Sequence, residues 1–151
     1  MKIEIDDLSR PQVQDLLSEH LANMYEITPV ESVHALNAAG LRDPTITFWT
    51  IWDGDALVGC GALRELSATS GEIKSMRTPI AARRRGAGRA MLNHIIDAAR
   101  ARGYTRLSLE TGAMAGFEPA RQLYRSAGFR EGGPFGEYAE DPNSVFMHLE
   151  L

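Results

Sequence analysis

A turn rich in arginine and glycine, at residues 83–89, constrains this chain more than any other segment, because an amphipathic helical pattern follows it directly. Gly86 and Gly88 let the backbone turn tightly and lie close to a ligand. The unpaired N–H groups at the start of the next helix point into such a turn, and their partial positive charge suits a phosphate. Arginines in the turn add donors that match phosphate oxygens. The segment predicts a pyrophosphate-binding turn, with a solvated turn and a capping glycine as the alternative.

The amino-acid sequence of this turn excludes two common classes of phosphate-binding site. A mononucleotide P-loop reads G-x-x-x-x-G-K-[ST], and neither a lysine nor a hydroxyl residue follows the glycines here. A dinucleotide fingerprint reads G-x-G-x-x-G, whereas Met91 stands where its third glycine would be. An RNA-binding role for the arginines is also disfavoured, because the net charge is −4 and no aromatic residues alternate with the arginines.

Length and composition indicate one globular domain spanning residues 1–151. The chain has 151 residues, of which 44% are hydrophobic and 24% charged, and it is long enough to bury a core. No apolar stretch approaches the roughly 20 residues needed to span a bilayer, and the acidic, alternating N-terminus is unlike a signal peptide. The single cysteine, Cys60, fits a reducing cytoplasm, and the scattered histidines indicate no metal site. We expect a cytoplasmic protein without nucleic-acid or membrane partners.

Hydrophobic periodicity predicts an alternation of strands and helices. Ser9-x-x-Gln12, with Pro11 between, reads as a capping box for a first helix whose apolar face runs from Val13 to Met24. Further helices are predicted at 31–39, 88–102 and 118–127, and strands at 2–6, 46–52, 56–66, 72–78, 106–111 and 144–151. The order β-α-α-β-β-β-α-β-α-β predicts an α/β fold, with a mixed sheet and helices on both faces.

Three short motifs lie at the ends of predicted elements. They are Arg83-x-x-Gly86-x-Gly88 in the turn, Thr78-Pro79 at the end of the strand predicted at 72–78, and Tyr124-x-x-x-Gly128-Phe129 at the end of the helix predicted at 118–127. Together they resemble the GCN5-related N-acetyltransferase (GNAT) superfamily over nearly the whole chain. The resemblance implies a GNAT-type mixed, mostly antiparallel central sheet, and acetyl-CoA as cosubstrate. One departure is Phe117, where the family often has an asparagine that contacts the cofactor.

The resemblance also implies which residues hold acetyl-CoA. In the family, the strand before the turn pairs with the amides of the pantetheine arm through main-chain hydrogen bonds. The turn and the start of its helix then bind the pyrophosphate. The residues implied are Met76, Arg77, Thr78, Arg83, Arg84, Arg85, Gly86, Ala87, Gly88 and Arg89.

Acetyl transfer to an amine requires the neutral amine, which a positioned base helps to form. Glu72 resembles in position the glutamate base of the histone-acetylating branch, and Glu110, at the end of the next strand, is the second candidate. Tyr124 lies on the apolar stripe of its helix, and its place in the family pattern implies an acid for the leaving thiolate. The alternatives are a core tyrosine bonded to a carbonyl and solvated strand carboxylates, with Lys74 as an ion-pair partner of Glu72.

The acceptor is not determined by these motifs. Residues 24–39 and 132–143 are expected to shape its site, and the second segment is a long loop that is either a lid or a surface connection. Carboxylates of this loop suit a cationic amine, whereas Lys74 and Arg77 suit the carboxylate of an amino acid. A small-molecule amine, an amino acid and a protein amine stay open, as does a homodimer. A non-catalytic acyl-CoA sensor is the alternative to an enzyme.

Overall fold

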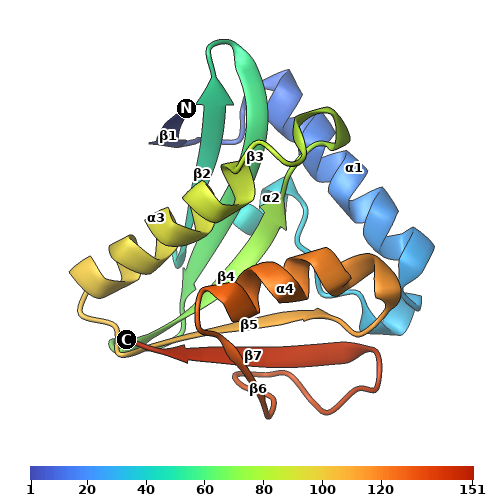
Figure 1. Cartoon of the computed structure of the whole chain (residues 1–151), viewed down its shortest axis with the longest axis vertical. Helices are drawn as coiled ribbons and strands as arrows, with labels where there is room; N and C mark the ends of the chain where they lie inside the picture. The colour runs from blue at the N-terminus through green and yellow to red at the C-terminus, as the bar shows by residue number, and fades with distance from the viewer.

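The computed structural model describes every residue apart from the side chain of Ile80. A seven-stranded sheet with the order β1-β2-β3-β4-β5-β7-β6 forms its centre (Figure 1). β4 and β5 run parallel, and every other neighbouring pair is antiparallel. The strands are β1 (Lys2–Ile5), β2 (Ile46–Asp53), β3 (Ala56–Glu65), β4 (Ser70–Arg77), β5 (Arg106–Gly112), β6 (Arg130–Gly132) and β7 (Ser144–Glu150). The predicted mixed, mostly antiparallel sheet is confirmed.

Helices cover both faces of the sheet, as the element order predicts (Figure 1). The helices α1 (Pro11–Ile27) and α2 (Ala38–Leu41) pack on one face, and α3 (Ala87–Ala101) and α4 (Glu118–Ser126) pack on the other. Three short 3-10 turns connect these elements: η1 (Val30–Ser32), η2 (Ile80–Ala82) and η3 (Ala115–Phe117). No described helix is long and apolar enough to cross a membrane.

Each face of the sheet has its own hydrophobic core, and the alternation of β2 shows why. Trp49 and Ile51 point toward α3, whereas Phe48 and Trp52 point toward α1, as the period of two requires. On the α3 side the buried helix residues are Met91, Leu92, Ile95, Ile96 and Ala99. The core on the α3 side continues across the gap between β4 and β5, from Ile73 to Leu107, Leu109 and Met147, so the sheet is anchored on both sides of that gap.

The start of α1 differs from the prediction. The capping box is wrong, because Arg10 is the N-cap residue and no side chain caps the helix. The hydroxyl of Ser9 instead donates to Oδ1 of Asp7, which also accepts the Ser9 backbone N–H at 3.0 Å. A local turn around the aspartate therefore satisfies the serine before the helix can use it. Pro11 does occupy the first helical position.

The helix predicted at 31–39 is also wrong. The segment forms η1, an extended stretch and then α2, which is capped by Oδ1 of Asn37 accepting the Gly40 backbone N–H at 2.9 Å. Tertiary contacts explain the difference, because Ser32 is buried and bonded to Asp141 rather than lying on a helix surface. The structure also adds β6, three exposed residues that carry no alternating pattern, and it begins β4 at Ser70 rather than at residue 72.

Candidate active site

β4 and β5 separate near the middle of the sheet, and a cavity of about 690 Å³ opens in the gap. Their parallel register ends at Ile73, opposite Leu109. On its other edge, β4 bulges against β3 around Ser75, which has a φ of 55°. A bulge of this kind bends the strand, so the backbone beyond Ile73 has no partner in β5. The cavity is walled by α1, the stretch after η1, β4, β5, the start of α3, α4 and part of the loop that follows β6.

The arginine–glycine turn lies at one end of this cavity. Gly86 is the N-cap of α3 and has a φ of 82°, in the left-handed region that glycine tolerates. A Cβ built on Gly88 would lie 3.4 Å from a methyl of Leu123, so the turn is packed against α4. The turn residues that line the cavity are Arg83, Arg84, Gly86, Ala87, Gly88 and Arg89. Arg85 is not among them, and its Nη1 lies 3.9 Å from Oδ2 of Asp53 at the surface.

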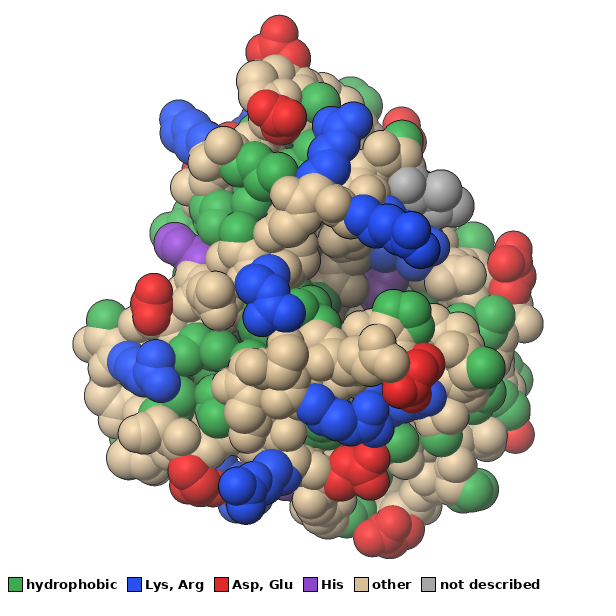
Figure 2. Space-filling view, in the orientation of Figure 1, with side chains coloured by type: hydrophobic (Ala, Val, Ile, Leu, Met, Phe, Trp, Pro, Cys, Tyr) green, Lys and Arg blue, Asp and Glu red, His purple; other side chains and the backbone are tan. Residues whose placement is uncertain are grey.

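Positive charge gathers around this end of the cavity. Figure 2 shows lysine and arginine side chains around a hollow in the face that α3 and α4 cover. Within the described part of the chain, Arg83 and Arg84 form no ion pair, and Arg89 donates to the hydroxyl of Ser126 at 2.9 Å. The N-terminal N–H groups of α3 add their partial charge. The strand residues Met76, Arg77 and Thr78 continue the wall toward the centre. This end is suited to a phosphate-containing ligand.

Tyr124 faces the centre of the cavity from α4. Its side chain is 7% exposed, and its ring packs edge-on against Phe129, with 5.8 Å between centroids. The hydroxyl makes no hydrogen bond with a described residue, unlike a core tyrosine bonded to a carbonyl. Burial, and then the charge of Glu110, raises the pKa of Tyr124 well above its ordinary value. The phenol therefore stays protonated and is available as a donor to a ligand in the cavity.

Glu72 lies on the opposite wall and is held by two partners. Its carboxylate accepts from Nζ of Lys74 at 3.1 Å and from the hydroxyl of Tyr138 at 2.5 Å. The lysine also donates to Tyr138 at 3.0 Å, so the three groups form a closed network. The side chains of Glu72 and Lys74 are only 3% and 8% exposed. The ion pair that the sequence left as an alternative is present, and it is buried rather than solvated.

Glu110, by contrast, is a carboxyl group without a counter-charge in contact. It lines the cavity at the point where β5 leaves β4, and it forms no ion pair with a described residue. Burial raises the pKa of Glu110 to about 7; the nearby Ser144 hydroxyl and the charge of Lys74 offset part of this rise, and the charges of Glu72 and Asp141 add to it. A carboxyl group with a pKa near 7 can take up and release a proton at neutral pH.

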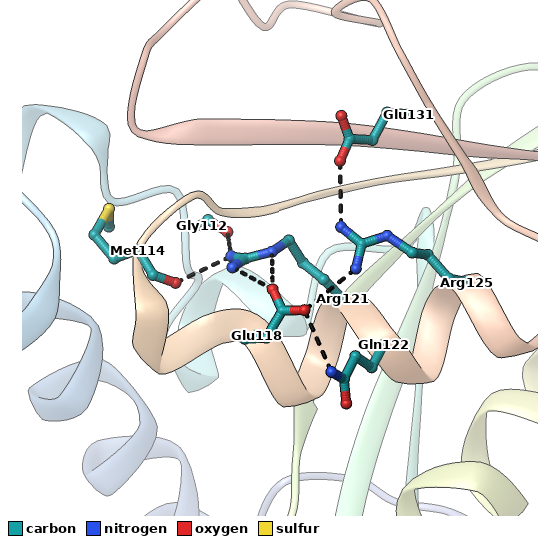
Figure 3. Close-up of polar contacts among 7 residues, drawn as sticks. All are labelled: Gly112, Met114, Glu118, Arg121, Gln122, Arg125 and Glu131. Carbon is teal, nitrogen blue, oxygen red and sulfur yellow. Dashed lines mark hydrogen bonds and ion pairs between the residues drawn. The ribbon is translucent and has the colours of Figure 1, made fainter.

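A buried arginine joins the end of β5 to the start of α4, as Figure 3 shows. Arg121 is 8% exposed, and its Nη1 donates to the carbonyls of Gly112 and Met114 at the end of β5. Its Nε and Nη2 donate to the carboxylate of Glu118 in the first turn of α4, at 3.1 and 2.7 Å. The arginine therefore clamps the end of β5 to α4, so that Glu110 and Tyr124 are held across the same gap.

The last turns of α1 form a further wall. Arg77 reaches across from β4, and its Nη2 and Nη1 lie 2.9 Å from Glu19 and 3.1 Å from Asn23. His20 and Thr28 are each 8% exposed, and His20 Nδ1 and Thr28 Oγ1 have no hydrogen-bond partner among the described residues. Burial, and then the charge of Arg77, lowers the pKa of His20 to about 4, so its ring is neutral. No cluster of potential metal ligands was found among the described residues.

Two segments far apart in the sequence meet beside Glu72. The hydroxyl of Ser32 donates to Asp141 at 2.6 Å and accepts from the amide of Asn143 at 3.4 Å. The rings of His34 and Tyr138 pack edge-to-face, with 5.1 Å between centroids. The segment after η1 and the loop between β6 and β7 thus form one continuous wall. The sequence leaves that loop as either a lid or a surface connection. In the structure, Tyr138 in the middle of the loop is part of the cavity wall.

Sequence reasoning missed two residues of this site. Tyr138 is not singled out in the loop at 132–143, which the sequence leaves as a lid or a surface connection, although an aromatic residue among glycines and acids is a signal of burial. Arg121 sits on the polar side of a helical pattern, and only the carbonyls at the end of β5 explain why it is buried. Neither contact can be found from local periodicity. The contact of Arg121 depends on how α4 lies against the end of β5, and the contact of Tyr138 depends on how the loop after β6 lies against β4.

Comparison with known proteins agrees with this geometry. The model of the Acetyltransferase (GNAT) family matches residues 11–129. The chain is 57% identical over 151 residues to the uncharacterized N-acetyltransferase YsnE of Bacillus subtilis, covering 100% of both chains. It is 39% identical over 141 residues to the IAA acetyltransferase of Azospirillum brasilense, covering 93% of this chain and 89% of the relative.

Solved structures show the same fold. A GNAT family acetyltransferase from Elizabethkingia anophelis, solved with acetyl-CoA bound, superposes with a TM-score of 0.69 at 19% identity, and the match covers 99% of this chain and 97% of the other. The family match spans most of the chain and includes the turn, both strands of the gap and α4. The chain therefore belongs to the GNAT family of acetyltransferases.

Proposed function

We propose that this protein transfers the acetyl group of acetyl-CoA to the amine of a small molecule, with Glu110 as the base and Tyr124 as the acid. One observation carries the proposal: one cavity joins the arginine–glycine turn to the gap between β4 and β5, and both side chains line it. The family relationship and the acetyl-CoA complex of the structurally similar Elizabethkingia anophelis protein support the choice of cosubstrate.

The turn fits the pyrophosphate of a coenzyme A group. The backbone around Gly88 is free of a Cβ on the cavity side, and the α3 N-terminus supplies N–H donors. Arg83, Arg84 and Arg89 add charge, whereas Arg85 is expected to contribute little because it faces Asp53. The pantetheine arm would then run along the part of β4 that has no partner in β5, from residue 74 to residue 78, and pair with its backbone.

The acetyl group of a cosubstrate held in this way would lie in the gap, between Tyr124 and Glu110. The amine nitrogen attacks the thioester carbonyl carbon, forming a C–N bond, and the C–S bond breaks. The amine proton passes to the Glu110 carboxylate, and the Tyr124 hydroxyl donates a proton to the departing sulfur. Unpaired backbone N–H groups of β4 are available for the oxyanion that develops on the carbonyl oxygen.

Glu110 is a better base than Glu72 on physical grounds. Two donors already stabilise the charged form of Glu72, and taking up an amine proton would break a buried ion pair. Glu110 has no ion-pair partner to lose, and its pKa of about 7 suits proton transfer at neutral pH. We assign to Glu72 the role of holding Lys74 and Tyr138 in the acceptor wall.

The acceptor end of the cavity is the end beside Glu72, where the segment after η1 contacts the loop between β6 and β7. These contacts close that end and favour a small acceptor over a protein surface. Ser32 and Asp141 join the two segments directly, and His34 packs on Tyr138. All four lie at or next to the cavity wall. An extended peptide would have to displace these contacts, whereas a small amine would not.

Two measurements test the proposal. Calorimetry should show that acetyl-CoA binds, and release of free thiol should follow when an amine panel is added to the saturated protein. Glu110→Gln should bind acetyl-CoA like the wild type while losing turnover. Binding without turnover with any amine would indicate an acyl-CoA sensor instead, and absence of binding at tens of micromolar acetyl-CoA would contradict the whole proposal.

A further inference from the structure

The charged side chains at the acceptor end of the cavity are not equivalent. Lys74 already donates to Glu72 and to Tyr138, and Arg77 already donates to Glu19 and to Asn23. Both cations are nearly buried, with side chains that are 8% and 9% exposed. The Nε of Arg77 has no hydrogen-bond partner among the described residues, but that atom is itself buried. They are the cations that an acceptor carboxylate would otherwise use.

A carboxylate on the acceptor would therefore find no cation ready for it. To bind one, Lys74 would have to leave Glu72, which would then be a buried anion without its partner. Arg77 would have to move to bring its buried Nε into the cavity or to leave Glu19, and either movement would disturb its contacts with the end of α1. The carboxylate would also lie near Glu110, whose own charge is not paired. Each of these effects opposes an acceptor that carries a negative charge beside its amine.

An ammonium group, by contrast, meets a complementary group. Glu110 is the carboxyl of this cavity that has no ion pair among the described residues, so an incoming ammonium gives it the counter-charge that it lacks. The same contact brings the amine proton within reach of the base.

The rest of the acceptor wall is apolar or neutral. The apolar lining residues from α1 and from the stretch after η1 are Met24, Ile27, Val33 and Ala35. The ring of Tyr138 adds an aromatic surface. His20 and Thr28 also line this wall, and the unpartnered Nδ1 of His20 and Oγ1 of Thr28 are buried and neutral, so they offer no charge to an acceptor.

We propose that the acceptor is a primary amine on an apolar or aromatic body that carries no carboxylate. This inference rests on the proposed acetyl transfer and narrows its substrate class. It decides between the two acceptor classes that the sequence leaves open, because the structure commits Lys74 and Arg77 to internal partners.

Three probes with one ring and different charges test this inference: phenethylamine, phenylalaninamide and phenylalanine. They share the aromatic body and the amine, and the amide controls for the bulk of a substituent beside the amine. With saturating acetyl-CoA and thiol release as the readout, kcat/KM for phenethylamine should exceed that for phenylalanine by at least tenfold. The neutral amide should lie close to the amine. Equal or higher kcat/KM for phenylalanine would overturn the inference, while leaving the proposed acetyl transfer standing.

A paired variant tests the reason for the preference. Glu72→Gln/Lys74→Gln removes both charges of the pair together, so it keeps the net charge of the wall and its hydrogen-bonding groups. If Lys74 does not bind acceptor carboxylates, the ratio of the kcat/KM values for phenethylamine and phenylalanine should change less than twofold. A selective tenfold loss of phenylalanine turnover would show that Lys74 reads a carboxylate and would contradict the inference. No turnover of the three probes while other amines of the panel are acetylated would overturn this inference alone. No turnover with any amine, despite acetyl-CoA binding, would overturn the proposed function and this inference with it.

Discussion

The two ends of the cavity are built in different ways. At the phosphate end, the turn before α3 uses neighbouring residues and their backbone, from Arg83 to Arg89. At the acceptor end, the wall depends on hydrogen bonds between Lys74 and Tyr138, 64 residues apart, and between Ser32 and Asp141, 109 residues apart. The phosphate end can therefore be recognised in a short stretch of sequence, and the acceptor end cannot.

The same side-chain types also have different roles at the two ends. Arg83 and Arg84 are exposed around the turn and form no ion pair with a described residue, so their charge is available to a ligand. Lys74 and Arg77 are largely buried and neutralise carboxylates of the protein itself. A count of positive residues would treat all four as equal, whereas two of them are paired within the protein and two remain available to a ligand.

The largest expected effect on activity comes from replacing Glu110, which lies between the two ends of the cavity. Glu110→Gln should lower kcat/KM by about 10²–10⁴, because the amine loses its base, and should leave acetyl-CoA affinity unchanged. Since the base works only when deprotonated, the wild type should lose activity below its pKa of about 7, and this break in the pH profile should vanish in the variant. Glu72→Gln should retain the break. The assignment is wrong if Glu72→Gln removes it instead.

The same substitution also gives a stability test with a definite sign. The carboxyl group titrates near 4.5 in the unfolded chain and near 7 in the folded protein. Between these values the folded state holds the proton more tightly, so the free energy of unfolding should fall as pH rises from about 4.5 to 7. At pH 8, Glu110→Gln should therefore raise the free energy of unfolding by about 1–2 kcal/mol and Tm by about 2–8 °C, and at pH 4 it should have little effect on either. An equal shift of Tm at both pH values would exclude this origin.

Tyr124→Phe tests the acid at the same gap. The ring is kept, and the expected loss of kcat is about 10–10³, with little change in acetyl-CoA affinity. Stability should not fall, because the hydroxyl has no hydrogen bond to lose within the described structure. Tyr104→Phe is a matched control: Tyr104 is 5% exposed and packs in the same core, but it does not line the cavity. A variant of Tyr124 with normal kcat and lower stability would show a purely structural residue.

Gly88→Val tests the phosphate end alone. The branched side chain should fill the space that the pyrophosphate needs, and acetyl-CoA affinity should fall tenfold or more, or about 1.4 kcal/mol. Arg84→Ala should weaken binding as well, whereas Arg85→Ala should not, because Arg85 points to Asp53 outside the cavity. Equal effects of the two arginine variants in calorimetry would mean that bulk charge rather than the shape of the turn binds the ligand.

These contrasts explain how far the sequence could be interpreted. The element order, the glycine turn and the stripe that carries Tyr124 depend on local periodicity and backbone freedom, and they correctly predicted the sheet and the helices on both faces. The segment 31–39 was misread because Ser32 is fixed by Asp141, a contact that no local pattern contains. For the same reason the sequence named Glu72 as the first candidate base and Glu110 as the second, whereas the function proposed above reverses that order. Their difference lies in Tyr138, which belongs to a distant loop.

Ser32→Ala tests whether the long-range contacts at the acceptor end act on that end alone, and its effect should be the smallest. The hydroxyl that joins Asp141 and Asn143 is lost, and the wall beside Tyr138 should loosen. One such hydrogen bond contributes about 0.5–1 kcal/mol, so KM for the amine should rise about two- to fivefold. Acetyl-CoA affinity and kcat should not change. Ser67→Ala is the matched control, because the Ser67 hydroxyl lies in the exposed β3–β4 connection, outside the cavity, and among the described residues contacts only Ser70 and the backbone N–H of Thr69. If Ser32→Ala weakened acetyl-CoA binding as strongly as it raised KM for the amine, the two ends would be one coupled unit, and the comparison between them would have to be given up.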